Sequence, residues 1–78
     1  MEEILRVIIE NLVDDKKSIS IESTNKDEST IVFKVKVAKN EMGKVIGRQG
    51  KVAYSIRNIM RAAASREGKK AEVEFVDD

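Results

Sequence analysis

The sequence contains no cysteine, no histidine, no proline and no tryptophan. The missing cysteines exclude a disulfide framework and a thiolate metal site, and the missing histidines remove the commonest zinc ligand and general base. No apolar run approaches the ~20 residues of a transmembrane helix, and the acidic start Met1-Glu2-Glu3 is unlike a secretory signal. We therefore expect a cytoplasmic protein that makes no contact with a membrane and holds neither metal nor cofactor.

Length and composition predict one folded domain over residues 1–78. A domain typically takes ~100–200 residues, so this chain has no room for a second. Hydrophobic residues make up 41%, enough for a core, and the net charge is only +1, unlike that of a disordered chain. The carboxylate pairs Asp14-Asp15 and Asp27-Glu28 fall in expected turns, and no nucleophile motif is present. We therefore expect no catalytic residues and no enzymatic activity.

Positive charge is concentrated in one segment of the chain. Residues 41–70 carry eight Lys or Arg side chains and two Glu, a local net charge of +6. Such an excess attracts polyanions, although a solvated helix face explains it equally well. The aromatic side chains are few, and Phe33 and Phe75 are expected on inward strand faces. A platform that stacks bases on aromatic rings is therefore disfavoured.

Hydrophobic periodicity predicts three helices and three strands in the order α-β-β-α-α-β. Helices are expected over 2–13, 41–46 and 51–66, and strands over 17–23, 30–38 and 70–76. Asn40 is expected to cap the short helix, and Gly68 fits the position just past the end of the long one. Helices that cover one face of a small sheet give a two-layer α+β domain.

The same periodicity predicts which face of each element is buried. In the first helix the stripe is Ile4, Ile8 and Leu12, with Leu5, Ile9 and Val13 beside it. In the long helix it is Val52, Ile56, Ile59, Met60 and Ala63. The second strand directs Ile31, Phe33, Val35 and Val37 inward, with Val32, Lys34 and Lys36 on the other face. The first strand directs Ile19 and Ile21 inward.

The segment between the two later helices carries the chemistry, with the sequence Val45-Ile46-Gly47-Arg48-Gln49-Gly50-Lys51. Its two glycines permit positive φ angles and a close approach of the backbone to a ligand. Backbone N–H groups at a helix N-terminus form an anion site. The basic side chains beside it would attract a phosphodiester backbone. The alternative is a plain connector whose glycines only permit a sharp turn, and we favour phosphate binding over it.

This segment resembles the signature loop of KH domains, and the element order is similar to their type II arrangement. The lead-in Gly43-Lys44-Val45-Ile46-Gly47, the Ser55-Ile56-Arg57 step and the run Ala62-Ala63-Ala64 resemble the KhpA family of small bacterial single-KH RNA-binding proteins. The resemblance implies a three-stranded sheet with helices on one face, and single-stranded RNA clamped over about four nucleotides. It also implies an RNA chaperone or post-transcriptional regulator, a homodimer or a heterodimer with a larger KH-containing protein, and a role in bacterial growth, division and cell shape.

The candidate RNA-binding residues are Lys44, Val45, Ile46, Gly47, Arg48, Gln49, Gly50 and Lys51. Val45, Ile46 and Val37 could supply an apolar floor for bases, but for Val45 and Val37 a place in the core is at least as good an explanation. Ala53 departs from the KH pattern, which has a large aliphatic residue there, so the groove beside the loop could be shallower, or Val52 and Ile56 could fill it.

A candidate partner interface is formed by Tyr54, Arg57 and Arg61, which share one side of the long helix. Base stacking by Tyr54 and a plain surface tyrosine are alternatives. Arg66, Lys69 and Lys70 lie near the helix end, where the dipole favours cations, and are not counted as ligands. Two alternatives to RNA binding stay open: a protein-interaction module with little RNA affinity, and binding of single-stranded DNA.

Overall fold

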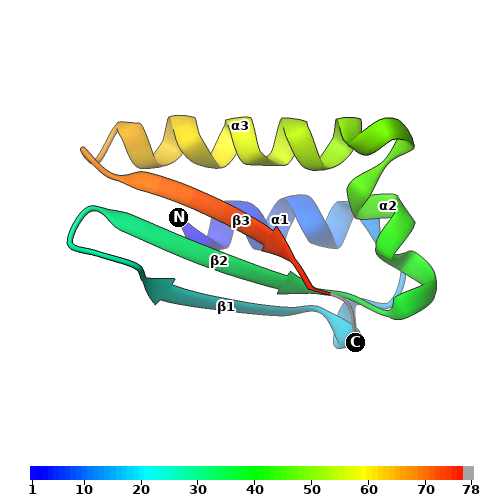
Figure 1. The fold of residues 1–78 in the computed structure, drawn as a ribbon. Helices are drawn as coiled ribbons and strands as arrows, with labels where there is room; N and C mark the ends of the chain where they lie inside the picture. The colour runs from blue at the N-terminus through cyan, green and yellow to red at the C-terminus, as the bar shows by residue number, and fades with distance from the viewer. Residues whose placement is uncertain (77–78) are drawn as a thin grey trace.

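The computed structural model describes residues 1–76, so the last two residues of the expected 1–78 domain lie outside it. The main elements are α1 (Glu2–Leu12), β1 (Ser20–Asn25), β2 (Thr30–Lys36), α2 (Met42–Ile46), α3 (Lys51–Ser65) and β3 (Lys70–Phe75) (Figure 1). Single 3₁₀ turns span Lys16–Ser18, Lys39–Glu41 and Arg48–Gly50. The predicted order α-β-β-α-α-β is confirmed.

The sheet has three strands in the order β1-β2-β3, with β1 antiparallel and β3 parallel to the central strand β2. Asp27 organises the hairpin between β1 and β2, because its Oδ1 accepts the N–H of Ser29 at 2.9 Å. That N–H lowers the pKa of the Asp27 carboxyl, with the Thr30 hydroxyl adding to the effect. The parallel pair needs a crossover connection, which α2 and α3 provide.

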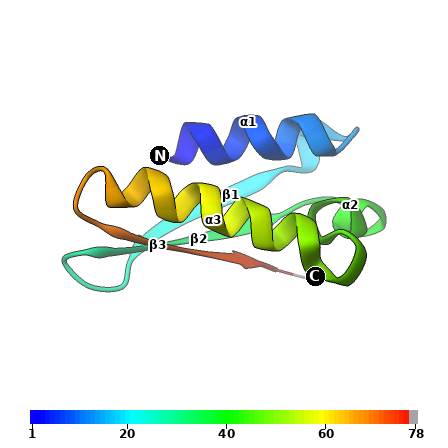
Figure 2. The same ribbon diagram turned by 90° about the horizontal axis from the view of Figure 1, so that it is seen from above.

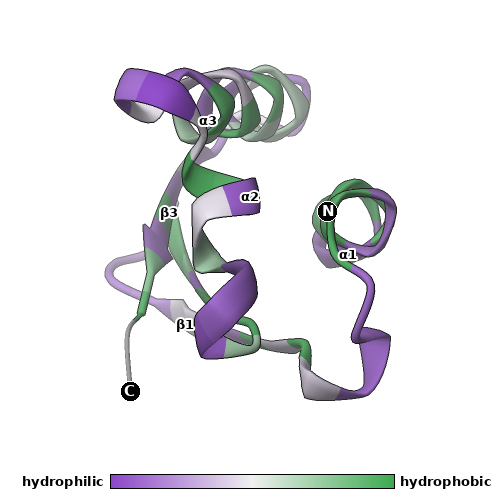
Figure 3. Ribbon diagram, turned by 90° about the vertical axis from the view of Figure 1, so that its right-hand side faces the viewer, coloured by the Kyte–Doolittle hydropathy of each residue, from purple (hydrophilic) through white to green (hydrophobic). Residues whose placement is uncertain are grey.

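All three helices lie on one side of the sheet, as expected for a two-layer α+β domain (Figures 2 and 3). Helices α1 and α3 run antiparallel (Figure 1), and buried apolar residues of the helices and the sheet form one core cluster. The largest fully buried side chains include Phe33 of β2, Leu5 and Ile9 of α1, and Ile56 and Met60 of α3.

The predicted stripes of both long helices are rotated from the observed ones. In α1 the buried row is Leu5 and Ile9, followed by Val13, whereas Ile4 is 43% exposed. In α3 the buried row is Ala53, Ile56, Met60 and Ala64, whereas Ile59 is 46% exposed. Each helix has two neighbouring apolar rows, and only one of them can face the sheet. Ala53 and Ala64 of α3 are buried, although alanine contributes little to a hydrophobic pattern in a sequence.

Three further expectations are corrected. The strand expected at 17–23 begins later, because Lys16–Ser18 forms a 3₁₀ turn, although Ile19 is buried as predicted. Val32 is also buried, although it lies on the opposite face from Phe33. On that face the ion pair between Lys26 and Glu72, at 3.4 Å, joins the segments on either side of β2. Asn40 lies inside a 3₁₀ turn and makes no side-chain cap to α2.

The rotation of α1 can be tested by making one substitution in each of its two apolar rows. Ile9→Ala should lower the free energy of unfolding by about 2–5 kcal/mol, since it leaves a cavity in the core. Ile4→Ala should cost about 1 kcal/mol or less, since Ile4 already meets solvent. Urea denaturation at low micromolar protein concentration measures both changes. Equal losses in the two variants would contradict the observed orientation.

Candidate nucleic-acid interface

The loop begins where α2 cannot continue. Gly47 adopts φ 77° and ψ 174°, which leaves the helix, while its N–H still donates to the Gly43 carbonyl at 2.8 Å. A Cβ on Gly47 would lie 2.4 Å from Val52 Cγ2 and 2.9 Å from the Val52 backbone nitrogen. Both the dihedral angle and the space therefore require glycine at this position.

The rest of the loop holds two consecutive residues in the left-handed region. Gln49 has φ 58° and Gly50 has φ 75°. A Cβ on Gly50 would meet nothing within 4 Å, so only its dihedral angle favours glycine. Within residues 1–76 the backbone N–H groups of Arg48 and Gln49 have no backbone acceptor. Free amides in such a turn form a concave anion-binding site, and a left-handed glutamine is a strained feature of the kind found at functional sites.

The basic side chains around the loop differ in whether they form ion pairs within the protein. Arg48 and Lys51 are exposed and form no ion pair with the described part of the chain, and Gln49 is exposed between them. Lys44 is already engaged: its Nζ lies 3.0 Å from Asp14 Oδ2 and 3.5 Å from Glu41 Oε1. The hydrogen bond to Asp14 raises the pKa of the Lys44 ammonium. Within residues 1–76, Arg48 and Lys51 are therefore the basic side chains at the loop whose charges are not neutralised by an ion pair.

Glu41 is a buried carboxylate that the sequence analysis did not single out. Its Oε1 accepts the backbone N–H of Asp14 at 2.9 Å, and both of its oxygens accept the N–H of Asp15, at 3.3 and 3.2 Å. Glu41 is 5% exposed and directly precedes α2. It therefore ties the helix that leads into the loop to the segment joining α1 and β1. No pattern marks such a contact in the sequence, because its partners are backbone groups 26 and 27 residues away.

The apolar residues beside the loop are divided between core and surface. Val45 and Val37 are buried in the core cluster, so of the three aliphatic candidates only Ile46 is half-buried. Ala53 is buried, and Val52 packs partly against the core beside Gly47. Ile46 and Val52 are therefore aliphatic side chains beside the loop that remain partly open to a base.

The three residues Tyr54, Arg57 and Arg61 do not behave as one patch. Tyr54 is 64% exposed. Arg57 is bound to the sheet: its Nε donates to the Val73 carbonyl at 3.1 Å, and its guanidinium lies 5.4 Å from the centre of the Phe75 ring. Arg61 is exposed. Arg57 and Arg61 line a groove of about 360 Å³ between α3 and β3, together with Ala71, Glu72, Val73 and Glu74.

The floor of this groove is the outer edge of β3. The N–H groups of Lys70 and Val76 donate toward Ser29 and Val35, on the side of β2. Because backbone groups alternate along a strand, those of Ala71, Val73 and Phe75 point away from β2. The bond from Arg57 to the Val73 carbonyl agrees with this orientation. Within residues 1–76 the outward groups of Ala71, Val73 and Phe75 have no backbone partner, although the Val73 carbonyl already accepts from Arg57.

Comparison with known proteins identifies the family. A family model for the KhpA/KhpB KH domain matches residues 2–75. The chain belongs to the KhpA/KhpB KH-domain family. It is 40% identical to the RNA-binding protein KhpA of Clostridium perfringens, over 97% of this chain and 100% of the relative. It is 36% identical to KhpA of Listeria monocytogenes over 99% of this chain and 100% of the relative, and 32% identical to KhpA of Chlamydia trachomatis over 100% and 99%. No solved structure matches.

Membership confirms the family and fold that the loop and the element order suggested. The KhpA/KhpB relatives are RNA-binding KH-domain proteins of bacteria rather than members of an enzyme family. Within residues 1–76 no helix is long and apolar enough to cross a membrane. The same part of the chain contains no group of three or more Asp and Glu side chains that could hold a metal ion.

The role of Glu41 can be tested by removing its carboxylate. Glu41→Ala should lower the free energy of unfolding by about 1–3 kcal/mol, because the N–H groups of Asp14 and Asp15 lose their acceptor. Urea denaturation followed by circular dichroism measures the change. Glu28→Ala removes the same charge from an exposed loop position and should change stability by about 0.5 kcal/mol or less. Equal effects of the two substitutions would show that the Glu41 contacts contribute nothing.

Proposed function

We propose that the protein binds single-stranded RNA by clamping the sugar-phosphate backbone of about four nucleotides in the Gly47–Gly50 loop. The observation that carries this proposal is the loop geometry. Two glycines and a left-handed Gln49 hold backbone N–H groups open between the exposed side chains of Arg48 and Lys51. Phosphate oxygens are the acceptors that such a site suits best. The RNA-binding names of the relatives support the choice of RNA.

From the loop, the strand is proposed to continue along the groove between α3 and β3. Ile46 can contact the first base, and the outward backbone groups of β3 can form hydrogen bonds with base edges. Lys44 contributes less than Arg48 and Lys51, because its ammonium is already bound by two carboxylates. It acts mainly by holding α2 in place.

Such contacts predict weak binding with little sequence preference. Most of the donors near the loop address phosphate, which carries no sequence information. Two or three phosphate contacts give a slope of log K against log salt of about −1.4 to −2, at roughly −0.7 per phosphate. Binding of this kind suits an RNA chaperone or post-transcriptional regulator in the cytoplasm, which must act on many transcripts.

The test is fluorescence anisotropy with a labelled, degenerate single-stranded RNA pool, for the wild type and the double variant Arg48→Asp, Gln49→Asp. The variant should lose at least tenfold in affinity, because it turns the loop acidic and repels phosphate. Lys17→Asp, Ser20→Asp makes the same charge change near β1, the edge of the sheet opposite β3, and should bind almost as tightly as the wild type.

Three results would contradict the proposal. An equal loss of RNA affinity in both variants would mean that the RNA is attracted diffusely to positive charge anywhere on the protein. Absence of binding by the wild type at low salt would favour a protein-interaction module. Tighter binding of a single-stranded DNA pool than of the RNA pool would favour the DNA alternative. Circular dichroism spectra must show that each variant is folded before its affinity is compared.

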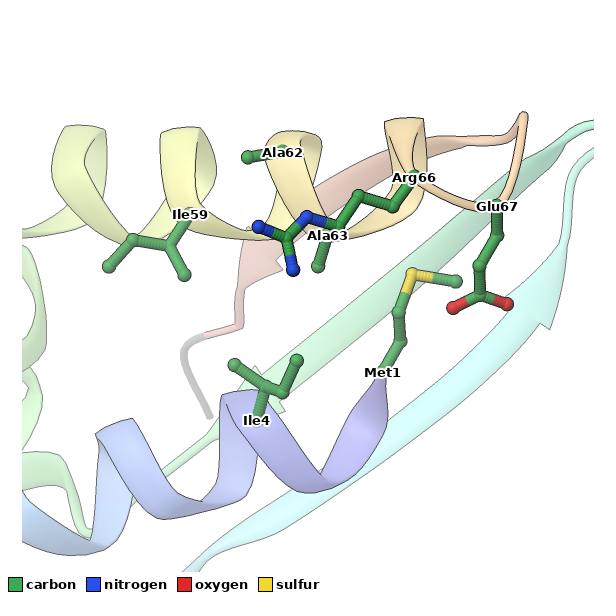
Figure 4. A pocket seen from close by; sticks show the side chains of 7 residues that line it. All are labelled: Met1, Ile4, Ile59, Ala62, Ala63, Arg66 and Glu67. Atoms are coloured by element: carbon green, nitrogen blue, oxygen red, sulfur yellow. The ribbon is translucent and has the colours of Figure 1, made fainter.

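A second candidate role is self-association, and a specific surface favours it. A hollow of about 360 Å³ lies between the start of α1 and the second half of α3, where Met1 and Ile4 face Ile59 and Ala63 (Figure 4). Ile4 and Ile59 are the large exposed side chains here, and Arg66 and Glu67 also line the hollow. In a twofold dimer each patch meets its own copy, so Arg66 of one chain can pair with Glu67 of the other around an apolar centre.

This placement shifts the expected partner interface from Tyr54, Arg57 and Arg61 to the α1–α3 hollow. Ile59→Glu should convert a dimer to a monomer in equilibrium sedimentation at micromolar concentration, because it places a charge in the apolar centre. Tyr54→Glu should leave the sedimentation mass at that of the dimer. A monomeric wild type would contradict the homodimer and leave a larger KH-containing protein as the partner to test. If Tyr54→Glu abolished the dimer and Ile59→Glu did not, the interface would instead lie at Tyr54, Arg57 and Arg61.

A further inference from the structure

An ion pair beside the loop engages a lysine that could otherwise face RNA. Lys44 is exposed and lies in α2, within one turn of Gly47. Its Nζ donates to Asp14 Oδ2 at 3.0 Å and lies 3.5 Å from Glu41 Oε1. One ammonium and two carboxylates together carry a net charge of −1. A phosphate that approaches the loop from this side therefore meets a negative group, although the nearest residue of the helix is basic.

The two carboxylates hold Lys44 under different conditions. Glu41 is buried, and its oxygens accept the backbone N–H groups of Asp14 and Asp15, so it has partners besides the lysine. The Asp14 side chain is 92% exposed, and within residues 1–76 the Lys44 ammonium is its one hydrogen-bond partner. That hydrogen bond is also the largest cause of the raised pKa of Lys44. The pair of Asp14 and Lys44 is therefore the exposed kind, which contributes little to stability and opens readily.

An exposed ion pair next to a phosphate site sets up a competition for the cation. A lysine ammonium is a point charge on a flexible stem, and its three N–H donors suit a carboxylate and a phosphate alike. The Lys44 ammonium must therefore leave Asp14 before it can neutralise a phosphate at the loop. Removal of the Asp14 charge would leave the ammonium free to donate toward the loop, while Glu41 keeps its backbone partners.

We propose that Asp14 limits the affinity of the loop for RNA by holding the Lys44 ammonium away from the phosphate backbone. This inference rests on the proposed function and deepens it, because it names a residue that sets the affinity of the same site without touching the strand. Arg48 and Lys51 supply charge at all times, whereas Lys44 supplies it only when its pair with Asp14 opens. A protein that acts on many transcripts gains from such a restraint, since weaker binding shortens the lifetime of each complex.

The test is the affinity of Asp14→Asn for the labelled, degenerate single-stranded RNA pool, measured by fluorescence anisotropy at several salt concentrations. Asparagine has nearly the shape of aspartate but lacks its charge. The variant should bind about two- to fivefold more tightly than the wild type, the range that corresponds to an exposed ion pair. Its slope of log K against log salt should be steeper by about 0.7, the contribution of one added phosphate contact. Circular dichroism must show that the variant is folded.

The matched control is Asp15→Asn, which removes the same charge from the next residue. The Asp15 side chain is exposed and forms no ion pair within residues 1–76. It accepts a hydrogen bond from the Ser18 hydroxyl at 2.7 Å, which an asparagine oxygen can also accept. Asp15→Asn should therefore bind RNA like the wild type. An equal gain of affinity in both variants would mean that the RNA responds only to total charge, and would overturn the inference.

A second substitution shows whether the effect passes through the lysine. In a Lys44→Gln background, Asp14→Asn should give no gain, because no ammonium is left to release. The double variant and Lys44→Gln alone should then bind RNA with the same affinity and the same salt slope. A gain that persisted without Lys44 would overturn the inference. Unchanged or weaker binding by folded Asp14→Asn in the otherwise wild-type protein would overturn it as well.

The loop variant Arg48→Asp, Gln49→Asp separates failure of the inference from failure of the proposed function. If the loop variant loses RNA affinity and Asp14→Asn gains none, the loop binds RNA and only the inference fails. If the loop variant binds RNA as tightly as the wild type, the proposed function fails, and the inference fails with it.

Discussion

The crossover that joins β2 to β3 turns at a point where the backbone leaves no room for a side chain. The nearest atoms to an added Cβ on Gly47 belong to Val52, in the first turn of the next helix, and one of them is the backbone nitrogen. This contact brings α2 and α3 together within a four-residue loop. The parallel pairing of β2 with β3 depends on that connection, since parallel strands require a crossover. The same close approach forces the loop backbone outward, so the fold and the candidate site share one constraint.

The loop is also held from its other side. Glu41 binds the backbone of Asp14 and Asp15, and Lys44 bridges Glu41 and Asp14. Helix α2 has only five residues, and so short a helix has little stability of its own. These contacts, together with the buried Val45, fix it to the α1–β1 segment and to the core. In the proposed complex, a preorganised loop binds phosphate without first ordering its own backbone, which offsets part of the entropic cost of a small site.

The sequence was sufficient to predict the features that depend on local patterning. The element order, the loop at Gly47–Gly50 and the glycine after α3 follow from periodicity and from glycine placement, and all three are present. The rotation of α1 was not predictable, because Ile4 and Leu5 begin two apolar rows of similar strength and only packing against the sheet selects one. The partners of Glu41 were not predictable either, since its contacts depend on tertiary structure. Lys69 and Lys70 resembled ordinary helix-end cations until the turn at Gly68 placed them beside Arg61.

The folded chain converts an uneven charge distribution along the sequence into an uneven distribution in space. On the open face of the sheet Lys34 lies between Glu22 of β1 and Glu74 of β3, so that opposite charges alternate across the strands. A polyanion gains little there. Between α3 and β3 the cations Arg57, Arg61, Lys69 and Lys70 instead line connected hollows, and Arg48 and Lys51 lie at the loop where α3 begins. In the proposed complex, a strand that binds on this side contacts the loop and the groove beside it. A chain of near-neutral net charge can thus present a locally positive surface to a polyanion, because attraction depends on local rather than total charge.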